Sequence, residues 1–422
     1  MTTLTDPPKE QFRLSMLLYD TRYRSATIQV IALIGFMLLA AWLISNTMQN
    51  LEALGKPVEF GFFAEPASYD INQRLIEYTS RDTHLRAAFV GLLNTLVVAF
   101  LGCVTATILG VIIGVARLSH NWIVARIMTV YVEMFRNVPV LLWIVFIMAI
   151  LIETLPAPRA FRGETPEASM MLGDSVAMTN RGVYIPEPLF SNSLGDVHLF
   201  GASSLRFDVS LDLMAILLVL GIGIWVSNWI KHRADRIQEQ TGDRPVTWWQ
   251  RTAVIVVPMA ILLYLLGFHL GYPELKGFNF KGGTHLRNSL IALWLALSLY
   301  TAAFIAEIVR AGILAISKGQ TEAAAALGLR PRKIMRLVIL PQALRVIIPP
   351  LISNYLNLTK NSSLAIAVGY MDITGTLGGI TMNQTGRELE CVLLLMLVYL
   401  SISLIISAIM NWYNESVKLK ER

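Results

Sequence analysis

Eight long apolar runs, separated by polar segments, constrain the fold of this chain more than any other feature. Each run is close to or above the roughly 18 residues that a helix needs to cross a bilayer core of about 30 Å. A soluble bundle of such runs would have no polar face for water. The sequence therefore predicts an all-α integral membrane protein with about eight transmembrane helices, at residues 28–44, 88–116, 127–152, 213–230, 253–270, 290–308, 346–369 and 392–410.

Composition and charge support this class. Of the 422 residues 55% are hydrophobic and only 15% are charged, where soluble domains carry nearer a quarter. With the N-terminus inside, the inner segments hold 20 Lys and Arg against 12 in the outer loops, so both termini are predicted to be cytoplasmic. The net charge of +6 fits loops that face anionic lipid, and no basic and aromatic residues interleave as a nucleic-acid surface would require.

The spans divide the chain into predicted segments. The polar stretches between the spans define the boundaries, and prolines with short alternating pieces in the longest outer stretch predict an exposed cap with some strand. The segments are a cytoplasmic N-terminal tail (1–26), the first transmembrane helix with a periplasmic loop (27–87), core helices (88–152), a periplasmic insert (153–208), an inserted helix pair with a cytoplasmic loop (209–271), and a second core region (272–422) containing a cytoplasmic loop (313–345).

Motifs for catalysis and metal binding are absent from the sequence. It contains no GxxxxGK followed by Ser or Thr, and no HExxH, CxxC or GxSxG. The six histidines are scattered rather than spaced as metal ligands. We therefore expect no catalytic residue, no metal site and no ATP hydrolysis by this chain, which is not expected to be an enzyme.

The loop 313–345, called the coupling loop below, carries the most informative pattern. Residues 320–327 are strong helix formers, Gly328 is placed for a left-handed cap, and Pro331 suits the first turn of a new helix. The first helix has an alanine face with Glu322 near its start, a shape that another protein could approach closely. On the helix alone, a docking element and a linker without a partner remain open.

The spacing of the coupling loop resembles the EAA loop of ABC-importer permeases. Glu322-Ala323-Ala324, Gly328 and the Val338-x-Leu340-Pro341 segment stand in that register, with Val338 where isoleucine is usual. In that family the loop seats in a cleft of a separate ATPase subunit. The resemblance therefore implies ATPase coupling by Gly319, Gln320, Glu322, Ala323, Ala324, Gly328 and Pro341.

Flanking segments narrow the resemblance to the polar amino acid subfamily. They begin at Glu307, Gly91, Phe135 and Lys360 and read EIVRAGI, GLLNTL, FRNVP and KNSSL. The chain is thus similar to the larger first permease of general L-amino-acid importers, or of glutamate, glutamine, aspartate and asparagine importers. That resemblance implies a five-helix type I core, extended by an N-terminal helix and two inserted helices.

The resemblance also implies a function and partners. It indicates a permease subunit in a bacterial inner membrane that moves polar L-amino acids inward by alternating access. Partners would be a cytoplasmic ABC ATPase dimer holding ATP and magnesium, a second and different permease chain, a periplasmic amino-acid-binding protein and membrane lipids, with no nucleic acid and no cofactor on this chain. The insert 153–208 could contact the binding protein or only shield the added spans.

Two other classes of protein fit the sequence less well. An ion-coupled secondary amino acid transporter would show inverted repeats, and none is visible in the sequence. A non-transporting membrane scaffold would need neither the register of the coupling loop nor a lysine inside a span. Both alternatives are therefore disfavoured.

Polar residues inside the predicted spans are candidates for the substrate path. A charge at the bilayer centre costs about 2.5 to 3.5 kcal/mol on insertion scales, so it requires a reason. Lys360 is such a charge, and Pro349 and Pro350 are predicted to prevent a straight helix before it. The hypothesis places Asn94, Thr95, Asn354, Asn357, Lys360, Asn361, Ser362 and Ser363 on the path. Alternatively, Lys360 only caps a broken helix or pairs with a neighbouring subunit.

Two further patterns predict structural contacts. Glu307 and Arg310 stand three residues apart, one helical turn, which favours an ion pair over a substrate contact. Gly110 and Gly114 form a GxxxG pattern that permits close packing of a second helix.

Overall fold

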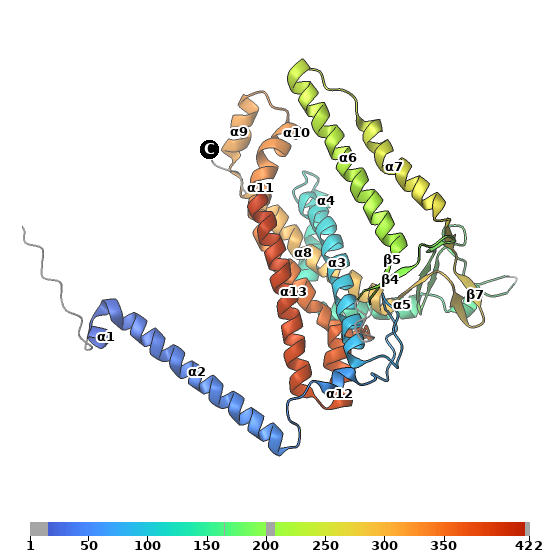
Figure 1. Ribbon diagram of the computed structural model, residues 1–422. Coiled ribbons are helices and arrows are strands. Elements are labelled where there is room, and N and C mark those ends of the chain that lie inside the picture. Colours follow the sequence, from blue (N-terminus) through green and yellow to red (C-terminus); the bar gives the residue numbers. More distant parts are fainter. Residues whose placement is uncertain (1–15, 164, 200–206, 418–422) are drawn as a thin grey trace, which may run out of the picture. The chain divides into compact units, whose positions relative to one another are not determined.

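The computed structural model describes residues 16–163, 165–199 and 207–417 and is predominantly helical, with short strands (Figure 1). Within these residues eight helices are long and apolar enough to cross a membrane. The predicted all-α membrane class with eight spans is therefore confirmed. The chain divides into two compact units, residues 1–60 and 61–422, each described by itself.

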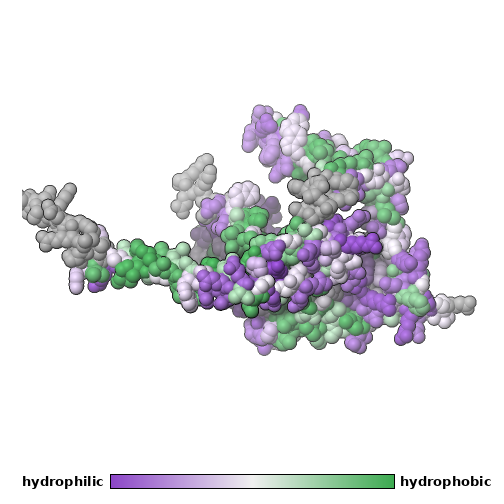
Figure 2. Space-filling model, turned by 60° about the horizontal axis from the view of Figure 1, so that its bottom comes forward, coloured by the Kyte–Doolittle hydropathy of each residue, from purple (hydrophilic) through white to green (hydrophobic). Residues whose placement is uncertain are grey.

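The first unit consists of α1 (Met16–Tyr19) and α2 (Thr21–Ala53), followed by a short turn. The predicted run 28–44 forms the middle of α2, a helix of 33 residues that is long enough to span. Its surface in the space-filling view is hydrophobic along most of its length (Figure 2). Residues 1–15 of the predicted tail lie outside the described residues.

Two long helices, α3 (His84–Ala116) and α8 (Asn288–Leu314), form the centre of the second unit. A Cβ atom added at Gly110 would lie 2.6 Å from Cβ of Ile305, and one at Gly114 would lie 2.7 Å from the carbonyl oxygen of Ala306. These contacts leave room only for glycine, so the GxxxG pattern does allow α3 to approach α8 closely.

The prediction of a single third span at 127–152 is wrong. The chain forms two helices in this stretch, α4 (Trp122–Asn137) and α5 (Val140–Thr154). Val138 is extended, with φ −107° and ψ 132°, and Pro139 precedes the first residue of α5. A proline disfavours helical backbone at the residue before it, so the chain breaks here. Only α5 belongs to a candidate span.

The inserted helices α6 (Leu211–Thr241) and α7 (Trp248–Leu265) form a hairpin (Figure 1). A Cβ atom at Gly223 would meet Cα of Ile255 at 3.3 Å, so the two backbones run close together. Gly242 ends α6 in the left-handed conformation, with φ +80°.

A small β cap is built from two loops that are far apart in the sequence. The antiparallel sheet β1-β2-β9 joins the predicted insert to the segment before α8, and β3 pairs with β6. Strands β4 and β5 pair with each other, as do β7 and β8. The strands are β1 (Ala177–Thr179), β2 (Gly182–Ile185), β3 (Glu187–Phe190), β4 (Asp196–Leu199), β5 (Phe207–Ser210), β6 (Phe268–Gly271), β7 (Glu274–Lys276), β8 (Asn279–Lys281) and β9 (Thr284–Arg287).

The C-terminal region contains the coupling loop and the last two spans. Pro349 and Pro350 lie inside a continuous helix and do not end it. The irregular part follows Lys360 instead, as a 3-10 segment and a π-helical segment. The elements are α9 (Lys318–Ala326), α10 (Pro331–Ile334), η3 (Met335–Ile339), α11 (Leu340–Asn361), η4 (Ser362–Val368), η5 (Thr374–Thr381), α12 (Met382–Thr385) and α13 (Glu388–Val417). Short 3-10 turns also occur as η1 (Gly61–Ala64) and η2 (Pro158–Phe161).

Candidate functional site

A polar pocket of about 360 Å³ lies between α8 and α11. Four of the eight predicted path residues line it, all from the last two turns of α11. They recur three and four residues apart, so they share one helix face beside Lys360. The lining residues are Tyr300, Thr301 and Phe304 from α8, and Asn354, Asn357, Leu358, Lys360 and Asn361 from α11.

The chemistry of the pocket suits a small polar molecule. Its volume falls in the range of small-ligand sites, about 300 to 1,000 Å³. Amide side chains offer both hydrogen-bond donors and acceptors, and the Lys360 ammonium offers three donors and a positive charge. Tyr300 and Phe304, with ring centroids 5.0 Å apart, supply an aromatic wall. A carboxylate with a polar side chain could bind here.

Four of the predicted path residues do not line this pocket. The Asn94 amide donates to the carbonyl oxygens of Gln73 (2.7 Å) and Met371 (2.8 Å), and the Thr95 hydroxyl accepts from the Ile373 amide (3.0 Å). Ser362 is buried and donates to the Thr359 carbonyl at 2.8 Å, while Ser363 is half-buried. Asn94 and Thr95 therefore hold distant chain segments together, whereas the bond from Ser362 to Thr359 stays within one turn.

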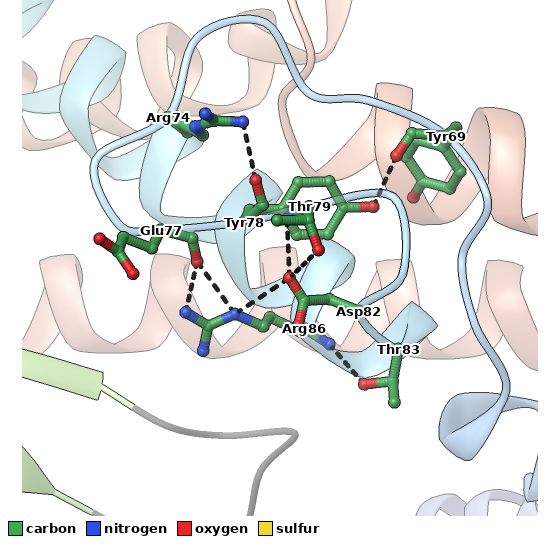
Figure 3. A network of polar contacts seen from close by, with 8 residues as sticks. All are labelled: Tyr69, Arg74, Glu77, Tyr78, Thr79, Asp82, Thr83 and Arg86. Atoms are coloured by element: carbon green, nitrogen blue, oxygen red, sulfur yellow. Dashed lines mark hydrogen bonds and ion pairs between the residues drawn. The ribbon is translucent and has the colours of Figure 1, made fainter.

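Asn94 and Thr95 belong to a larger network, called here the polar clasp, that joins residues 65–95 to residues 371–381. Thr381 is its meeting point, since its hydroxyl lies 3.0 Å from both the Tyr69 hydroxyl and Nδ1 of His84. The Tyr78 hydroxyl donates to the Tyr69 carbonyl at 2.8 Å, and the Arg86 guanidinium reaches the Glu77 carbonyl and Asp82 (Figure 3). The clasp thus ties the start of α3 to η5.

Burial shapes the protonation of the clasp. It raises the pKa of Tyr69 to about 12 and raises that of Tyr78, so both phenols remain hydrogen-bond donors. Asp372, between the last two spans, is fully buried and accepts from the Gly375 amide (2.8 Å) and the Tyr399 hydroxyl (3.2 Å). Burial raises the pKa of this carboxyl to about 6, against the lowering effect of those hydrogen bonds.

The predicted pair of Glu307 and Arg310 is present and has a third member. The Arg310 guanidinium lies 2.7 Å from Oε1 of Glu307, and Arg117 at the end of α3 forms an ion pair with Oε2. Sequence spacing could locate Arg310 because it lies on the same helix turn. Arg117 stands 190 positions away and left no signal in the pattern.

The coupling loop folds as the helix propensities predict. Helix α9 is followed by Gly328 at φ +75°, in the left-handed conformation, and Pro331 begins α10. Pro341 lies in the first turn of α11, and the Gln342 amide donates to the Gln320 side-chain oxygen at 3.3 Å. Gly319, Gln320, Glu322 and Ala323 are exposed, whereas Ala324 is buried.

The C-terminal half of α9 exposes small apolar side chains. Leu327 is 81% exposed beside the alanine face, and only Ala324 of this helix is buried. Exposed apolar side chains that are contiguous mark surfaces for a partner. Within the described residues no cluster of His, Cys, Asp and Glu could hold a metal ion.

Comparisons with known proteins agree on one family. Residues 245–419 match the family described as "Binding-protein-dependent transport system inner membrane component". The chain is 60% identical to the Rhodobacter capsulatus glutamate/glutamine/aspartate/asparagine transport system permease protein BztB, over all of both chains. It is 42% identical to the general L-amino acid transport system permease protein AapQ of Rhizobium johnstonii, over 97% of this chain and 96% of that one.

Other proteins also match. The putative amino-acid ABC transporter permease protein YhdX of Escherichia coli is 42% identical, with 94% of this chain and 95% of that one covered. A crystal structure of an amino acid ABC transporter with histidines aligns with a TM-score of 0.42 and 18% identity, over 78% of this chain and 94% of that chain.

Proposed function

The chain belongs to the permease subunits of binding-protein-dependent amino acid ABC importers, and from that premise we propose that it moves acidic amino acids and their amides into the bacterial cytoplasm. The Rhodobacter capsulatus relative is named for those four substrates. The observation that carries the proposal is the pocket of Lys360 and three asparagines, which suits a carboxylate or amide side chain.

Transport would proceed by alternating access at the pocket between α8 and α11. Asn354, Asn357 and Asn361 would hydrogen-bond the substrate, and Lys360 would neutralise a carboxylate during passage. Lys360 is exposed on its own chain. Inside a membrane an exposed charge would face lipid, which is costly unless a polar cavity surrounds it. A second permease chain, different from this one, would therefore complete the wall of the pocket around Lys360.

The energy would come from a separate ATPase dimer that holds ATP and magnesium. We infer that α9 seats in a cleft of the ATPase through Glu322 and the alanine face, with Gly319, Gln320 and Gly328 shaping the contact. Pro341 lies in the first turn of α11, so movement of the seated loop would be passed directly to the pocket helix. The triad of Arg117, Glu307 and Arg310 would keep the ends of α3 and α8 together during this movement.

The orientation that fits this mechanism places both termini and the coupling loop in the cytoplasm of a bacterial inner-membrane protein. The β cap and the polar clasp would then face the periplasm, where an amino-acid-binding protein delivers substrate. The chain itself would bind no cofactor. The count of Lys and Arg in the loops supports this orientation.

Uptake by the purified complex tests the proposal. The chain, the second permease chain, the ATPase and the binding protein are reconstituted in vesicles, and uptake of glutamate and glutamine is measured with and without ATP. Lys360→Met is expected to lower glutamate uptake far more than glutamine uptake, because only glutamate carries the second carboxylate. Lys281→Met, at the exposed end of strand β8 in the cap, is the matched control.

Two outcomes would contradict the proposal. Uptake that continues without ATP while an ion gradient is present would indicate a secondary transporter. Unchanged rate, affinity and selectivity in the Lys360→Met complex would remove Lys360 from the path.

A further inference from the structure

The α6–α7 hairpin concentrates tryptophans and basic residues toward its free end. Trp248 and Trp249 begin α7, Trp229 lies just before Lys231, and Trp225 lies one turn before Trp229; these four of the chain's nine tryptophans are at least half exposed. Basic residues stand among them, at Lys231, Arg233 and Arg251. Amphipathic aromatic rings prefer the level of the lipid headgroups, which places this end at a membrane surface.

Helix length gives the depth of these groups independently. The apolar run 213–230 of α6 is about 27 Å long at 1.5 Å per residue, close to the thickness of the hydrocarbon core. Lys231 is the first residue after that run. Its ammonium therefore lies at the boundary between hydrocarbon and headgroups.

A contact between the two helices brings Arg251 to the same boundary. Its Nε donates to the Ser227 hydroxyl at 3.2 Å, and Ser227 is buried one turn before Lys231. Arg251 stands in the first turn of α7, where the Cα–Cβ bond tilts toward the helix start and hence toward the hairpin end. The guanidinium is thereby oriented, with its terminal nitrogens left to reach the headgroup level.

The next acidic residue along α6 has another basic partner. Asp235, one turn beyond Lys231, forms an ion pair with Arg244 at 2.8 Å. The Arg233 guanidinium lies 5.8 Å from the centroid of the Trp229 ring, so it adds positive charge beside the aromatic group. A phosphate between Lys231 and Arg251 would meet an ammonium and a positioned guanidinium.

We propose that the free end of the α6–α7 hairpin binds the phosphate headgroup of an anionic phospholipid between Lys231 and Arg251. Ser227 positions the guanidinium, and the exposed tryptophans lie around the acyl-chain boundary. The source of the phosphate is a lipid, because the cations lie at the edge of an apolar surface that lipid tails cover. This binding site is separate from the transport pocket and does not depend on the transported substrate.

Lipid retention by the full-length chain tests the proposal. The protein is purified in neutral detergent, incubated with phosphatidylglycerol or phosphatidylcholine, and examined by native mass spectrometry. A basic residue near an anionic lipid surface contributes about 1 kcal/mol, which is a factor of about five in affinity. Retention of phosphatidylglycerol is therefore expected to be roughly thirtyfold weaker in Lys231→Gln/Arg251→Gln, while Lys276→Gln/Lys281→Gln in the cap retains it like the wild type.

Further variants and competitors distinguish lipid binding from a loss of folding and from a site for free phosphate. If the double variant fails to fold, the single variant Lys231→Gln is measured instead, and its retention of phosphatidylglycerol should be about fivefold weaker. Arg251→Lys should retain most of the binding. Equal retention of phosphatidylcholine, displacement by excess inorganic phosphate, or unchanged binding in Lys231→Gln would each overturn the proposal.

Discussion

The polar clasp buries its polar side chains, whereas the coupling loop leaves most of its side chains exposed. In the clasp, polar side chains are buried and satisfied by partners far along the chain, as at Thr381, which serves both Tyr69 and His84. In the coupling loop, α9 leaves alanines and Leu327 open, with a single described side-chain bond from Gln342 to Gln320. The clasp is thus complete within the chain, whereas the loop is shaped for a partner. Changes in the clasp should therefore cost stability, and changes in the loop should cost coupling.

The largest effect is expected at Gly91, where α3 meets the clasp. An added Cβ would clash with the Thr376 side chain and lie 2.8 Å from the Asp372 carbonyl oxygen. Gly91→Leu should lower the unfolding free energy by more than about 3 kcal/mol, beyond the usual range for overpacking. Thermal unfolding in detergent measures it. Gly35→Leu in α2, where no atom of the chain lies within 4 Å, is the control, and equal losses in both variants would contradict a packed clasp.

Titration of Asp372 is expected to change the unfolding free energy by roughly 2 to 3 kcal/mol. Its pKa is raised from 3.8 to about 6, so the folded state binds more protons than the unfolded state between those values. The unfolding free energy should be highest below about pH 4 and should fall as pH rises through about 6. Asp372→Asn should flatten this slope, because an amide does not titrate. The amide oxygen can still accept hydrogen bonds from Gly375 and Tyr399, so the fold should be kept. An identical slope in the variant would show that other groups are responsible.

Removing the shared hydroxyl of the clasp should cost about 1 to 3 kcal/mol of unfolding free energy. Thr381→Val keeps the shape but leaves Tyr69 and His84 without that partner. Thr252→Val is a matched change on α7, where the hydroxyl bonds only within its own helix turn. The control should stay within about 0.5 kcal/mol. Equal unfolding midpoints for the two variants would indicate that the hydroxyl is dispensable.

The smallest effect on stability, and the clearest on coupling, is expected at Gly328. Left-handed backbone costs a residue with a side chain about 1 to 2 kcal/mol, so Gly328→Val should shift the turn after α9. Recovery of the ATPase with the purified chain should fall while the unfolding midpoint changes little. Gly277→Val places the same residue at φ +69° in the cap, with no atom within 4 Å. If the ATPase is also lost when the Gly277→Val chain is purified, the prediction that Gly328 acts specifically in ATPase docking is contradicted.

Local patterns account for what the sequence predicted correctly. Each of the eight spans is a contiguous run whose length is set by bilayer thickness, so it needs no knowledge of neighbours. The left-handed turn at Gly328 and the pair of Glu307 and Arg310 depend on residues within one or two turns. Even the break at Val138 is visible in the sequence through Pro139, once the proline is given more weight than the hydrophobicity of the run.

The sequence by itself thus determined the membrane class, the number of spans, the shape of the coupling loop and the family. Only the tertiary structure decided which polar residues line the pocket and which form the clasp. Asn94 and Asn357 both look like costly polar residues inside spans, yet one bonds Met371 and the other faces a cavity. The reason is physical: the fate of a buried polar group depends on whichever partner the fold places beside it, and here that partner stands up to about 300 residues away.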